Sequence, residues 1–287
     1  MIPVFELHRP SDLDEALSLM TGLDEVACYA GGTELIQVMK MGFADARHLI
    51  DLKPIAELGG IDVLPGGALR IGATVTHRDI EHSAVVAERL PTLVALEHHV
   101  ANVRIRNVGT LGGNLCFAEP HSDPATLLVA CEATVTLAGE AAPRRTLSLE
   151  DFLVDAFTTD RADAEILTEV TIPALPADTR LSYRRFALTE RPAVSVACRV
   201  RVVDGRLADA RIVVGAVGPK AVSCRAAASL DGLSTDALRK AIGDVAVACA
   251  EEVEPLDELD LDPAYLRNLV AVHVRRALAD ALAEVAA

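Results

Sequence analysis

The sequence predicts an α+β protein in which two packed domains meet near a pair of prolines. A chain of 287 residues exceeds the usual size of one domain. Strand-like and helical segments are mixed up to Pro173 and Pro176, whereas residues 193–217 alternate in the period-two manner of an antiparallel sheet. Hydrophobic residues make up 51% of the chain, which is enough for a core and excludes a disordered protein. One large domain is the alternative.

The N-terminal part of the chain predicts alternating helices and strands. The run Ser-Asp-Leu-Asp from Ser11 reads as a capping box, and apolar residues at helical spacing follow it, so a first helix is expected there. Residues 26–30 predict a short strand, and the next glycine pair leads into a second helix that opens at Thr33. A further strand is expected over residues 47–52.

The middle of the chain contains an irregular segment between predicted helices. Residues 69–75 predict a strand, Thr76 and Asp79 form a second capping box before a helical stretch, and residues 91–98 predict another helix. Residues 105–124 then break all periodicity with three glycines and two prolines. A long irregular segment inside a compact domain is usually functional.

The rest of the chain predicts one helix, two strands and then the C-terminal domain. The helix starts at Asp123-Pro124 and runs to Cys131, and the strands cover residues 133–138 and 165–172. The C-terminal domain is expected to hold a three-stranded antiparallel sheet with a hairpin turn at Asp204-Gly205, and helical stretches over residues 223–230, 235–253 and 263–285.

The charge and the cysteine pattern exclude several classes of function. The formal net charge is −15, so the summed field repels nucleic-acid phosphates and anionic lipids. No apolar run reaches the roughly 18 residues that a membrane span needs, and the N-terminus does not read as a secretory leader, so a cytoplasmic protein is expected. The six cysteines include no CxxC pair, so neither a metal ion nor an iron–sulfur cluster is expected on this chain.

Two glycine segments carry the strongest chemical signal. Gly31-Gly32 lies between a predicted strand and a predicted helix, where free backbone amides and the helix dipole favour an anion. A plain tight turn is the more common explanation of an isolated glycine pair, because most such turns hold no ligand. The second segment, residues 109–114, offers further amides, and two such cradles facing each other suit a pyrophosphate. Neither segment matches GxGxxG, and the chain contains no GxxxxGK[ST].

Several strings resemble the FAD-binding subunits of the xanthine dehydrogenase and carbon monoxide dehydrogenase group. Residues 30–35 read AGGTEL, and residues 110–115 read TLGGNL and are followed by Ala118-Glu119-Pro120 and Asp123-Pro124. These match the paired AGGxxL and TIGGN...AxPxxD signatures of that family, with Leu111 in place of the usual Ile. Further matches are spread along the chain: residues 165–169, 172–173, 193–197, 265–267 and 274–278.

The resemblance implies a domain organisation. Residues 1–175 are expected to form a two-lobed FAD-binding domain of the vanillyl-alcohol-oxidase-like (PCMH) type, with lobes of about residues 1–55 and 56–175. Residues 176–287 are expected to form the small C-terminal domain of molybdenum hydroxylase flavoproteins.

The resemblance also implies a set of FAD-binding residues. The amides of residues 31–35 are expected to hold the pyrophosphate, Asp123 to accept hydrogen bonds from the ribose side, and Leu167 to touch the adenine. The N-cap of the following helix is a second role for Asp123, compatible with the first. Where the family often has a lysine near the flavin, this chain offers only arginines. The full expected set is Ala30, Gly31, Gly32, Thr33, Glu34, Leu35, Thr110, Gly112, Gly113, Asn114, Asp123, Leu167, Arg184 and Arg185.

Membership of this family implies an electron-transfer role without a catalytic acid, base or nucleophile on this chain. Partner subunits are expected to carry the remaining cofactors: a large subunit with molybdopterin and a small subunit with two [2Fe-2S] clusters, in a dimer of heterotrimers. Electrons are expected to pass through FAD to NAD, oxygen or a quinone. The alternative is a stand-alone flavin-dependent oxidase or reductase of the same fold, which needs a substrate-capping domain that the C-terminal residues are too few to form.

Three other groups of residues receive structural interpretations. His98-His99 is interpreted as the end of a helix, because adjacent helical residues do not share a face. His77, with Asp79 and Glu81, is interpreted as a solvated first helical turn. Cys116 has no second cysteine beside it and is interpreted as a small buried residue.

Overall fold

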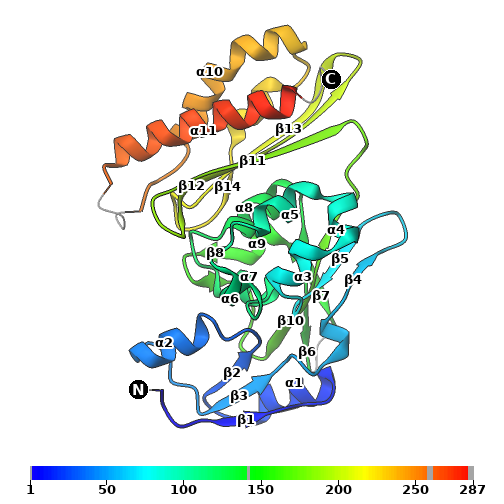
Figure 1. The fold of residues 1–287 in the computed structure, drawn as a ribbon, viewed down its shortest axis with the longest axis vertical. Coiled ribbons are helices and arrows are strands. Elements are labelled where there is room, and N and C mark those ends of the chain that lie inside the picture. The colour runs from blue at the N-terminus through cyan, green and yellow to red at the C-terminus, as the bar shows by residue number, and fades with distance from the viewer. Residues whose placement is uncertain (1, 141–142, 257–260, 284–287) are drawn as a thin grey trace. The chain divides into compact units, whose positions relative to one another are not determined.

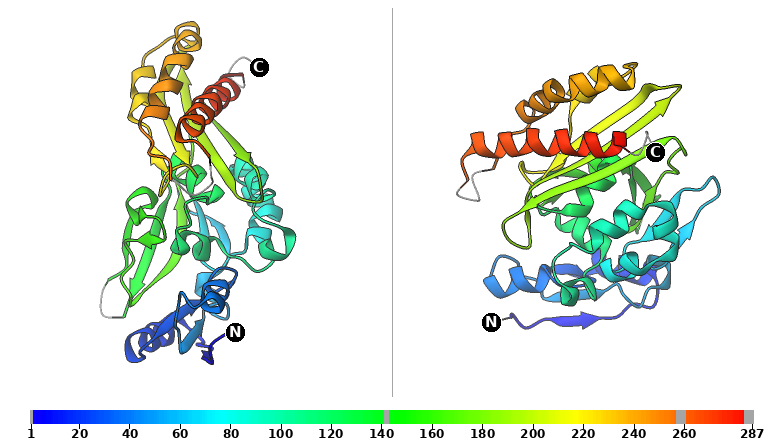
Figure 2. Two further views of the ribbon diagram at one scale, coloured as in Figure 1. Left: turned by 90° about the vertical axis from the view of Figure 1, so that its left-hand side faces the viewer. Right: turned by 45° about the horizontal axis from the view of Figure 1, so that its top comes forward.

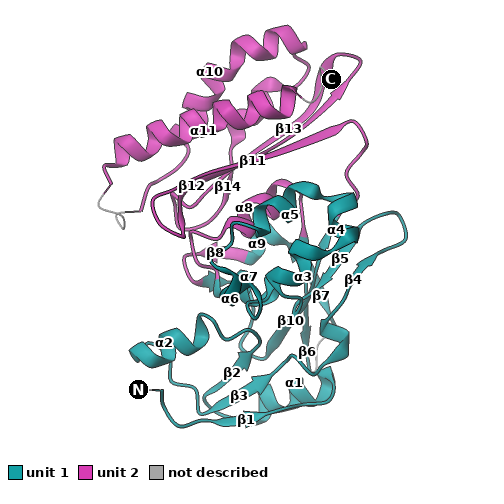
Figure 3. Ribbon diagram, in the orientation of Figure 1, with its two compact units in different colours: residues 1–117, 134–152, 158–172 teal, residues 118–133, 153–157, 173–287 magenta. Residues whose placement is uncertain are grey.

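The computed structural model describes residues 2–140, 143–256 and 261–283, which form two compact units (Figure 3). The first unit comprises residues 1–117, 134–152 and 158–172, and the second comprises residues 118–133, 153–157 and 173–287. The second unit thus takes two short segments, residues 118–133 and 153–157, in addition to the residues from 173 onward.

The first unit begins with a three-stranded parallel sheet and two helices (Figure 1). Their bounds are β1 (Glu6–His8), α1 (Leu13–Gly22), β2 (Val26–Tyr29), α2 (Leu35–Met41) and β3 (His48–Asp51). The strand order is β1-β3-β2, and alternate residues of β3 are buried on opposite faces. Ile50 packs into one apolar cluster with Leu17 of α1, whereas Leu49 packs into another with Met39 of α2. The two helices therefore cover opposite faces of this sheet.

The remainder of the first unit is built on a five-stranded antiparallel sheet, in the order β4-β5-β10-β6-β7. Its strands are β4 (Ile61–Val63), β5 (Leu69–Gly72), β6 (Thr134–Gly139), β7 (Arg145–Ser148) and β10 (Glu165–Ile172). The other elements of this part are the 3-10 helix η1 (Ala56–Leu58), α3 (His77–His82), α4 (Ala84–Arg89), α5 (Pro91–Glu97), α6 (Val103–Arg106), α7 (Leu111–Phe117), α9 (Leu149–Phe152) and the short strand β9 (Thr158–Thr159).

The structure confirms most of the predicted elements in this unit and corrects three details. The first helix is present, but Asp12 caps it instead of Ser11, by accepting a hydrogen bond from the amide of Glu15. The predicted capping box of Thr76 and Asp79 is confirmed at the start of α3. The second helix begins at Leu35, two residues later than expected. Residues 105–124 are less irregular than predicted, because helix α7 forms within them despite its glycines.

The second unit contains a four-stranded antiparallel sheet in the order β11-β12-β13-β14. Its elements are α8 (Asp123–Ala130), β8 (Leu153–Asp155), β11 (Thr179–Ala187), β12 (Pro192–Val203), β13 (Arg206–Gly215), β14 (Val222–Ser223), the 3-10 helix η2 (Arg225–Leu230), α10 (Thr235–Glu251) and α11 (Pro263–Ala283). The prediction of three strands was wrong by one, because β14 is only two residues long and gives no period-two pattern. The predicted hairpin turn is confirmed, with positive φ at both Asp204 and Gly205. The expected last helix reached Val285, and residues 284–287 lie outside the described part.

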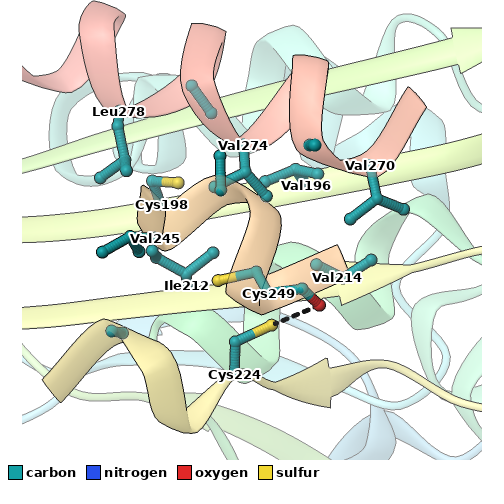
Figure 4. Packing of buried hydrophobic residues seen from close by; sticks show 14 of the residues in the cluster. Val196, Cys198, Ile212, Val214, Cys224, Val245, Cys249, Val270, Val274 and Leu278 are labelled. Carbon is teal, nitrogen blue, oxygen red and sulfur yellow. Dashed lines mark hydrogen bonds between the residues drawn. The ribbon is translucent and has the colours of Figure 1, made fainter. Parts of the chain in front are cut away.

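The core of the second unit lies between its sheet and the helices α10 and α11, which cover one face (Figure 2). Figure 4 shows this core from close by, with Val196 and Cys198 of β12 under Val274 of α11. Ser195, the residue before Val196, faces the other way and shares a hydrogen bond with Thr126 of α8, so strand β12 is buried on both faces. Burial raises the pKa of the Cys198 thiol well above its usual value, which keeps the sulfur protonated. Among the described residues, no helix is both long and apolar enough to cross a membrane.

Candidate functional site

The first glycine segment connects β2 to α2 and leaves backbone donors unpaired. The chain leaves β2 at Tyr29, passes through Gly32 at a φ of +69°, and enters α2 at Leu35. Among the residues that the structure describes, none accepts a hydrogen bond from the amides of residues 31–33 or of Leu35. Unpaired amides before a helix, together with the positive end of its dipole, form a binding place for an anion.

The two glycine segments lie against each other within the first unit. A Cβ atom on Gly31 would lie 2.2 Å from the carbonyl oxygen of Val108 and 2.7 Å from the Cα of Gly109. Both neighbours are backbone atoms, so only glycine permits this approach. The structure thus confirms that the two glycine segments are neighbours.

Lys53, with Asp51 and Tyr29, supports the first segment, and the sequence interpretation did not include these residues. The Lys53 ammonium donates a hydrogen bond of 2.9 Å to the carbonyl oxygen of Ala30 and lies 2.6 Å from the Asp51 carboxylate. It also lies 3.8 Å from the centroid of the Tyr29 ring, and a Cβ on Gly32 would lie 2.3 Å from that ring. The signal was available, because parallel strands end at the same edge of a sheet and Asp51 ends the strand beside β2.

The second glycine segment differs, because its amides already have acceptors. Four successive amides donate within the unit: Leu111 to the carbonyl of Val75 at 3.0 Å, Gly112 to the carbonyl of Ala73 at 3.0 Å, Gly113 to Oγ1 of Thr110 at 3.1 Å, and Asn114 to the carbonyl of Thr110 at 2.9 Å. The expectation that this segment adds several unpaired amides was therefore wrong. The residues after β5 lie alongside the start of α7 and accept the first two of these bonds, which the irregular sequence pattern did not reveal.

A buried pair of a histidine and a glutamate, His77 and Glu97, lies next to the second glycine segment. His77 Nδ1 lies 2.8 Å from Oε2 of Glu97, and these side chains are 4% and 0% exposed. The His77 amide also donates a 3.0 Å hydrogen bond to the carbonyl of Gly109. The interpretation of a solvated helical turn was thus wrong for His77. It was also wrong for Glu81, which is 6% exposed and lies 3.0 Å from Arg106 of α6.

The environment of Glu81 keeps it ionised. Burial raises its pKa, but hydrogen bonds from three basic side chains, one of them Arg106, outweigh this and lower the pKa to about 2. The predicted helix end at His98 is confirmed, since α5 ends at Glu97, and His98 is one of these three partners.

Three expected site residues belong to the second unit, where two of them form one cluster. The Asp123 carboxylate accepts a hydrogen bond from the Tyr183 hydroxyl and lies 3.4 Å from Nε of Arg185. Burial, and next the negative charge of Asp123, raise the pKa of Tyr183 well above its usual value, so the hydroxyl stays protonated. The N-cap role considered for Asp123 was wrong, because Ser122 caps α8.

Arg184 and Arg185 are successive residues of β11, so their side chains lie on opposite faces of the strand and have different partners. Arg184 lies 2.8 Å from the Asp280 carboxylate on α11, and its side chain is 47% exposed. Arg185 shares the Asp123 cluster and is 18% exposed. Of the two, only Arg185 is thus grouped with another expected site residue.

Two further residues singled out in the sequence, Leu167 and Cys116, belong to the first unit. Leu167 is buried in β10, opposite Leu137 of β6, next to an irregularity in the pairing. Burial raises the pKa of the Cys116 thiol to about 12, which agrees with its interpretation as an unreactive residue.

Comparison with known proteins identifies the family. Residues 3–175 match the family described as "FAD binding domain in molybdopterin dehydrogenase", and residues 185–281 match the "CO dehydrogenase flavoprotein C-terminal domain". The medium chain of carbon monoxide dehydrogenase from Hydrogenophaga pseudoflava is 31% identical, with 96% of both chains covered. The medium subunit of nicotine 6-hydroxylase from Paenarthrobacter nicotinovorans is 33% identical, with 76% of both chains covered.

The fold agrees with this relationship. A chain in the solved structure of carbon monoxide dehydrogenase from Hydrogenophaga pseudoflava superposes with a TM-score of 0.94 at 31% identity, over 99% of each chain. The chain therefore belongs to the family of FAD-binding medium subunits of molybdenum hydroxylases, a group of oxidoreductases that includes carbon monoxide dehydrogenase and xanthine dehydrogenase.

Proposed function

We propose that this subunit binds the FAD pyrophosphate on the amides of residues 31–35 and relays electrons from a [2Fe-2S] subunit to NAD, oxygen or a quinone. One observation carries the proposal: the amides of residues 31–33 and of Leu35 have no acceptor among the described residues, and Gly31 is packed against the start of the second glycine segment. A diphosphate supplies several anionic oxygens at the spacing that successive amides recognise. The donor set of the first segment thus fits the cofactor of the family.

The remaining residues of the first unit position this loop and close it. Lys53 fixes the Ala30 carbonyl, so the amide that follows it is held in one orientation. Gly31 packs against the backbone of Val108 and Gly109, and Thr110, Gly112, Gly113 and Asn114, which follow directly, are proposed to contact the cofactor. Leu167 is proposed to contact the adenine. When bound, the flavin accepts single electrons and donates a hydride, and the protein supplies position and charge.

Arg185, and not Arg184, is proposed as the cation near the flavin ring. Arg184 is paired with Asp280, whereas Arg185 shares the buried cluster of Asp123 and Tyr183. A guanidinium stays charged at all physiological pH values, so it favours negative charge on the reduced ring. We expect Arg185→Gln to lower the midpoint potential of the bound flavin, and Arg184→Gln, its matched control, to leave that potential unchanged. Equal shifts in both variants would contradict the assignment.

The proposed setting is a cytoplasmic complex with a large molybdopterin subunit and a small subunit carrying two [2Fe-2S] clusters, assembled as a dimer of heterotrimers. NAD, oxygen or a quinone is the proposed acceptor. Residues 1–175 are proposed as the FAD-binding domain, of the PCMH type with lobes of about residues 1–55 and 56–175, and residues 176–287 as the C-terminal domain. The substrate is then selected by the large subunit, since no catalytic side chain is assigned to this chain.

The direct test is the cofactor content of the purified complex. The chain is co-expressed with its large and small partner subunits, and the cofactor released by heat is identified and counted by chromatography. The proposal predicts close to one FAD per chain and a reduced flavin spectrum after substrate is added. A folded complex without flavin, or one in which substrate reduces the clusters but not the flavin, would refute it.

A further inference from the structure

A separate group of ligand atoms converges on the three-stranded sheet of the first unit. Glu6 and His8 lie two residues apart on β1 and therefore share a face, and His48 lies opposite Glu6 on β3. Nε2 of His8 lies 3.0 Å from Nδ1 of His48, which lies 3.7 Å from Oε2 of Glu6. These three atoms all lie within 4.8 Å of one another. We propose that Glu6, His8 and His48 bind a divalent transition-metal ion of the Zn²⁺ type.

The distances suit a tetrahedral ion. Ligand atoms about 2.0–2.1 Å from a tetrahedral zinc ion lie about 3.3 Å from one another. The observed 3.0 Å and 3.7 Å lie on either side of this value. The Glu6 side chain is 68% exposed, so its carboxylate is free to move by the few tenths of an ångström that would bring it to the ideal ligand spacing. Two imidazoles and one carboxylate favour Zn²⁺ or Ni²⁺ over Ca²⁺ and Mg²⁺, which prefer oxygen ligands.

Both imidazole rings can bind the ion while they remain neutral, because a ring proton can move from one nitrogen to the other. The hydrogen bond between His8 and His48 requires a proton on one of the two facing nitrogens. When that proton moves to the other nitrogen of its ring, two neutral rings present both lone pairs to the ion.

The backbone holds the three ligands in place and keeps them apart from the proposed FAD site. His48 lies at the start of the central strand, and Ile50, two residues further on the same face, is fully buried. Gly31 follows the end of β2, and β2 and β3 are parallel, so the two sites lie at opposite ends of the strands. Three protein ligands leave the fourth position of the ion to water.

The test measures metal binding to the untagged full-length chain. Titration calorimetry with zinc chloride is expected to show one ion per chain, and Co²⁺ is expected to give the absorption bands of a tetrahedral complex. His48→Ala should abolish binding, and Glu6→Gln should weaken it by about tenfold or more. His98→Ala is the matched control, because His98 also lies 2.8 Å from a carboxylate, that of Glu81. This variant should bind the metal ion as the unaltered chain does.

The outcomes separate this site from other sources of metal binding. The proposal is overturned if the unaltered chain binds no stoichiometric ion, if Glu6→Gln and His48→Ala both bind normally, or if His98→Ala loses as much affinity as they do. Thermal unfolding shows whether each variant folds, and Glu6→Gln decides the matter if His48→Ala does not. FAD content should stay the same in all four proteins, so this test is independent of the proposed function.

Discussion

The loop after β2 and the start of α7 both contain a glycine pair, and they differ in what their backbone amides do. Before α2, the amides of residues 31–33 have no acceptor among the described residues. At α7, the amides of residues 111–114 all bond to nearby oxygens, and a Cβ on Gly112 would lie 2.6 Å from the carbonyl oxygen of Ala73. Both pairs allow two backbones to touch, but only the first also leaves donors for a ligand. Glycine in a family signature can therefore serve binding or packing.

Replacing Gly31 should have the largest effect on FAD binding. In Gly31→Ala the new Cβ meets the backbone of Val108 and Gly109, so the amide run must move away from the second segment. The resulting overpacking is expected to destabilise the FAD-bound state by about 1–3 kcal/mol. This lowers the FAD affinity by roughly fivefold to 150-fold. Gly22→Ala is the control, because a Cβ on Gly22 meets no atom within 4 Å. Fluorescence titration with FAD measures both, and equal affinities would contradict the account.

Replacing Gly112 should affect stability more than binding. In Gly112→Ala the Cβ lies 2.6 Å from the Ala73 oxygen and 2.7 Å from the Ala73 Cβ, which should lower the free energy of unfolding by about 1–3 kcal/mol. Denaturant unfolding of the FAD-free chain checks this value. The FAD affinity of the folded variant should fall much less than in Gly31→Ala. If the two variants lose FAD affinity to the same extent, the proposed difference between the segments does not exist.

A pair of threonines provides a finer comparison. Oγ1 of Thr110 accepts the Gly113 amide at 3.1 Å, so Thr110→Val leaves that amide unsatisfied and should lower stability by about 1 kcal/mol. The Thr33 hydroxyl has no partner among the described residues, so Thr33→Val should change stability by less than about 0.5 kcal/mol. Thermal unfolding without FAD measures the two side by side. A larger loss in Thr33→Val would reverse the comparison.

Lys53 should have the smallest effect. Lys53→Met keeps most of the aliphatic chain over the Tyr29 ring but removes the hydrogen bond to the Ala30 carbonyl. The Lys53 side chain is 44% exposed, so a contribution of about 0.2–1 kcal/mol is expected, and FAD affinity should fall by about 1.4-fold to fivefold. The loss should shrink at high salt, because screening weakens the contribution of the charge. A loss that is independent of salt would assign the effect to packing instead.

Local signals in the sequence were enough to locate most elements. Hydrophobic period, the capping box at Thr76 and the Asp204-Gly205 turn each describe a few neighbouring residues, and the structure bears these predictions out, whereas the expected caps at Ser11 and Asp123 are one residue away from the observed ones. Helix α7 was missed because its glycines weaken the helical signal, while contacts with residues 73–75 stabilise it. Strand β14 was missed because two residues carry no period.

The candidate site shows the same limit. The glycine pairs were visible in the sequence, but the acceptors of their amides come from residues distant along the chain, such as Ala73 and Val75. The burial of His77 likewise depends on Glu97, twenty residues away. Lys53 was inferable only by noting that the strands ending at Tyr29 and Asp51 are parallel neighbours. Sequence spacing thus identified which groups were available, and tertiary contacts decided which of them stay unpaired.

The most direct measurement is amide hydrogen exchange on the full-length chain with and without FAD. The account predicts that the amides of residues 31–35 exchange rapidly without FAD and become protected when it binds. The amides of residues 111–114 should be protected in both states, since their acceptors belong to the protein. Unchanged exchange at residues 31–35 on FAD binding, or protection gained mainly at residues 111–114, would contradict the central claim.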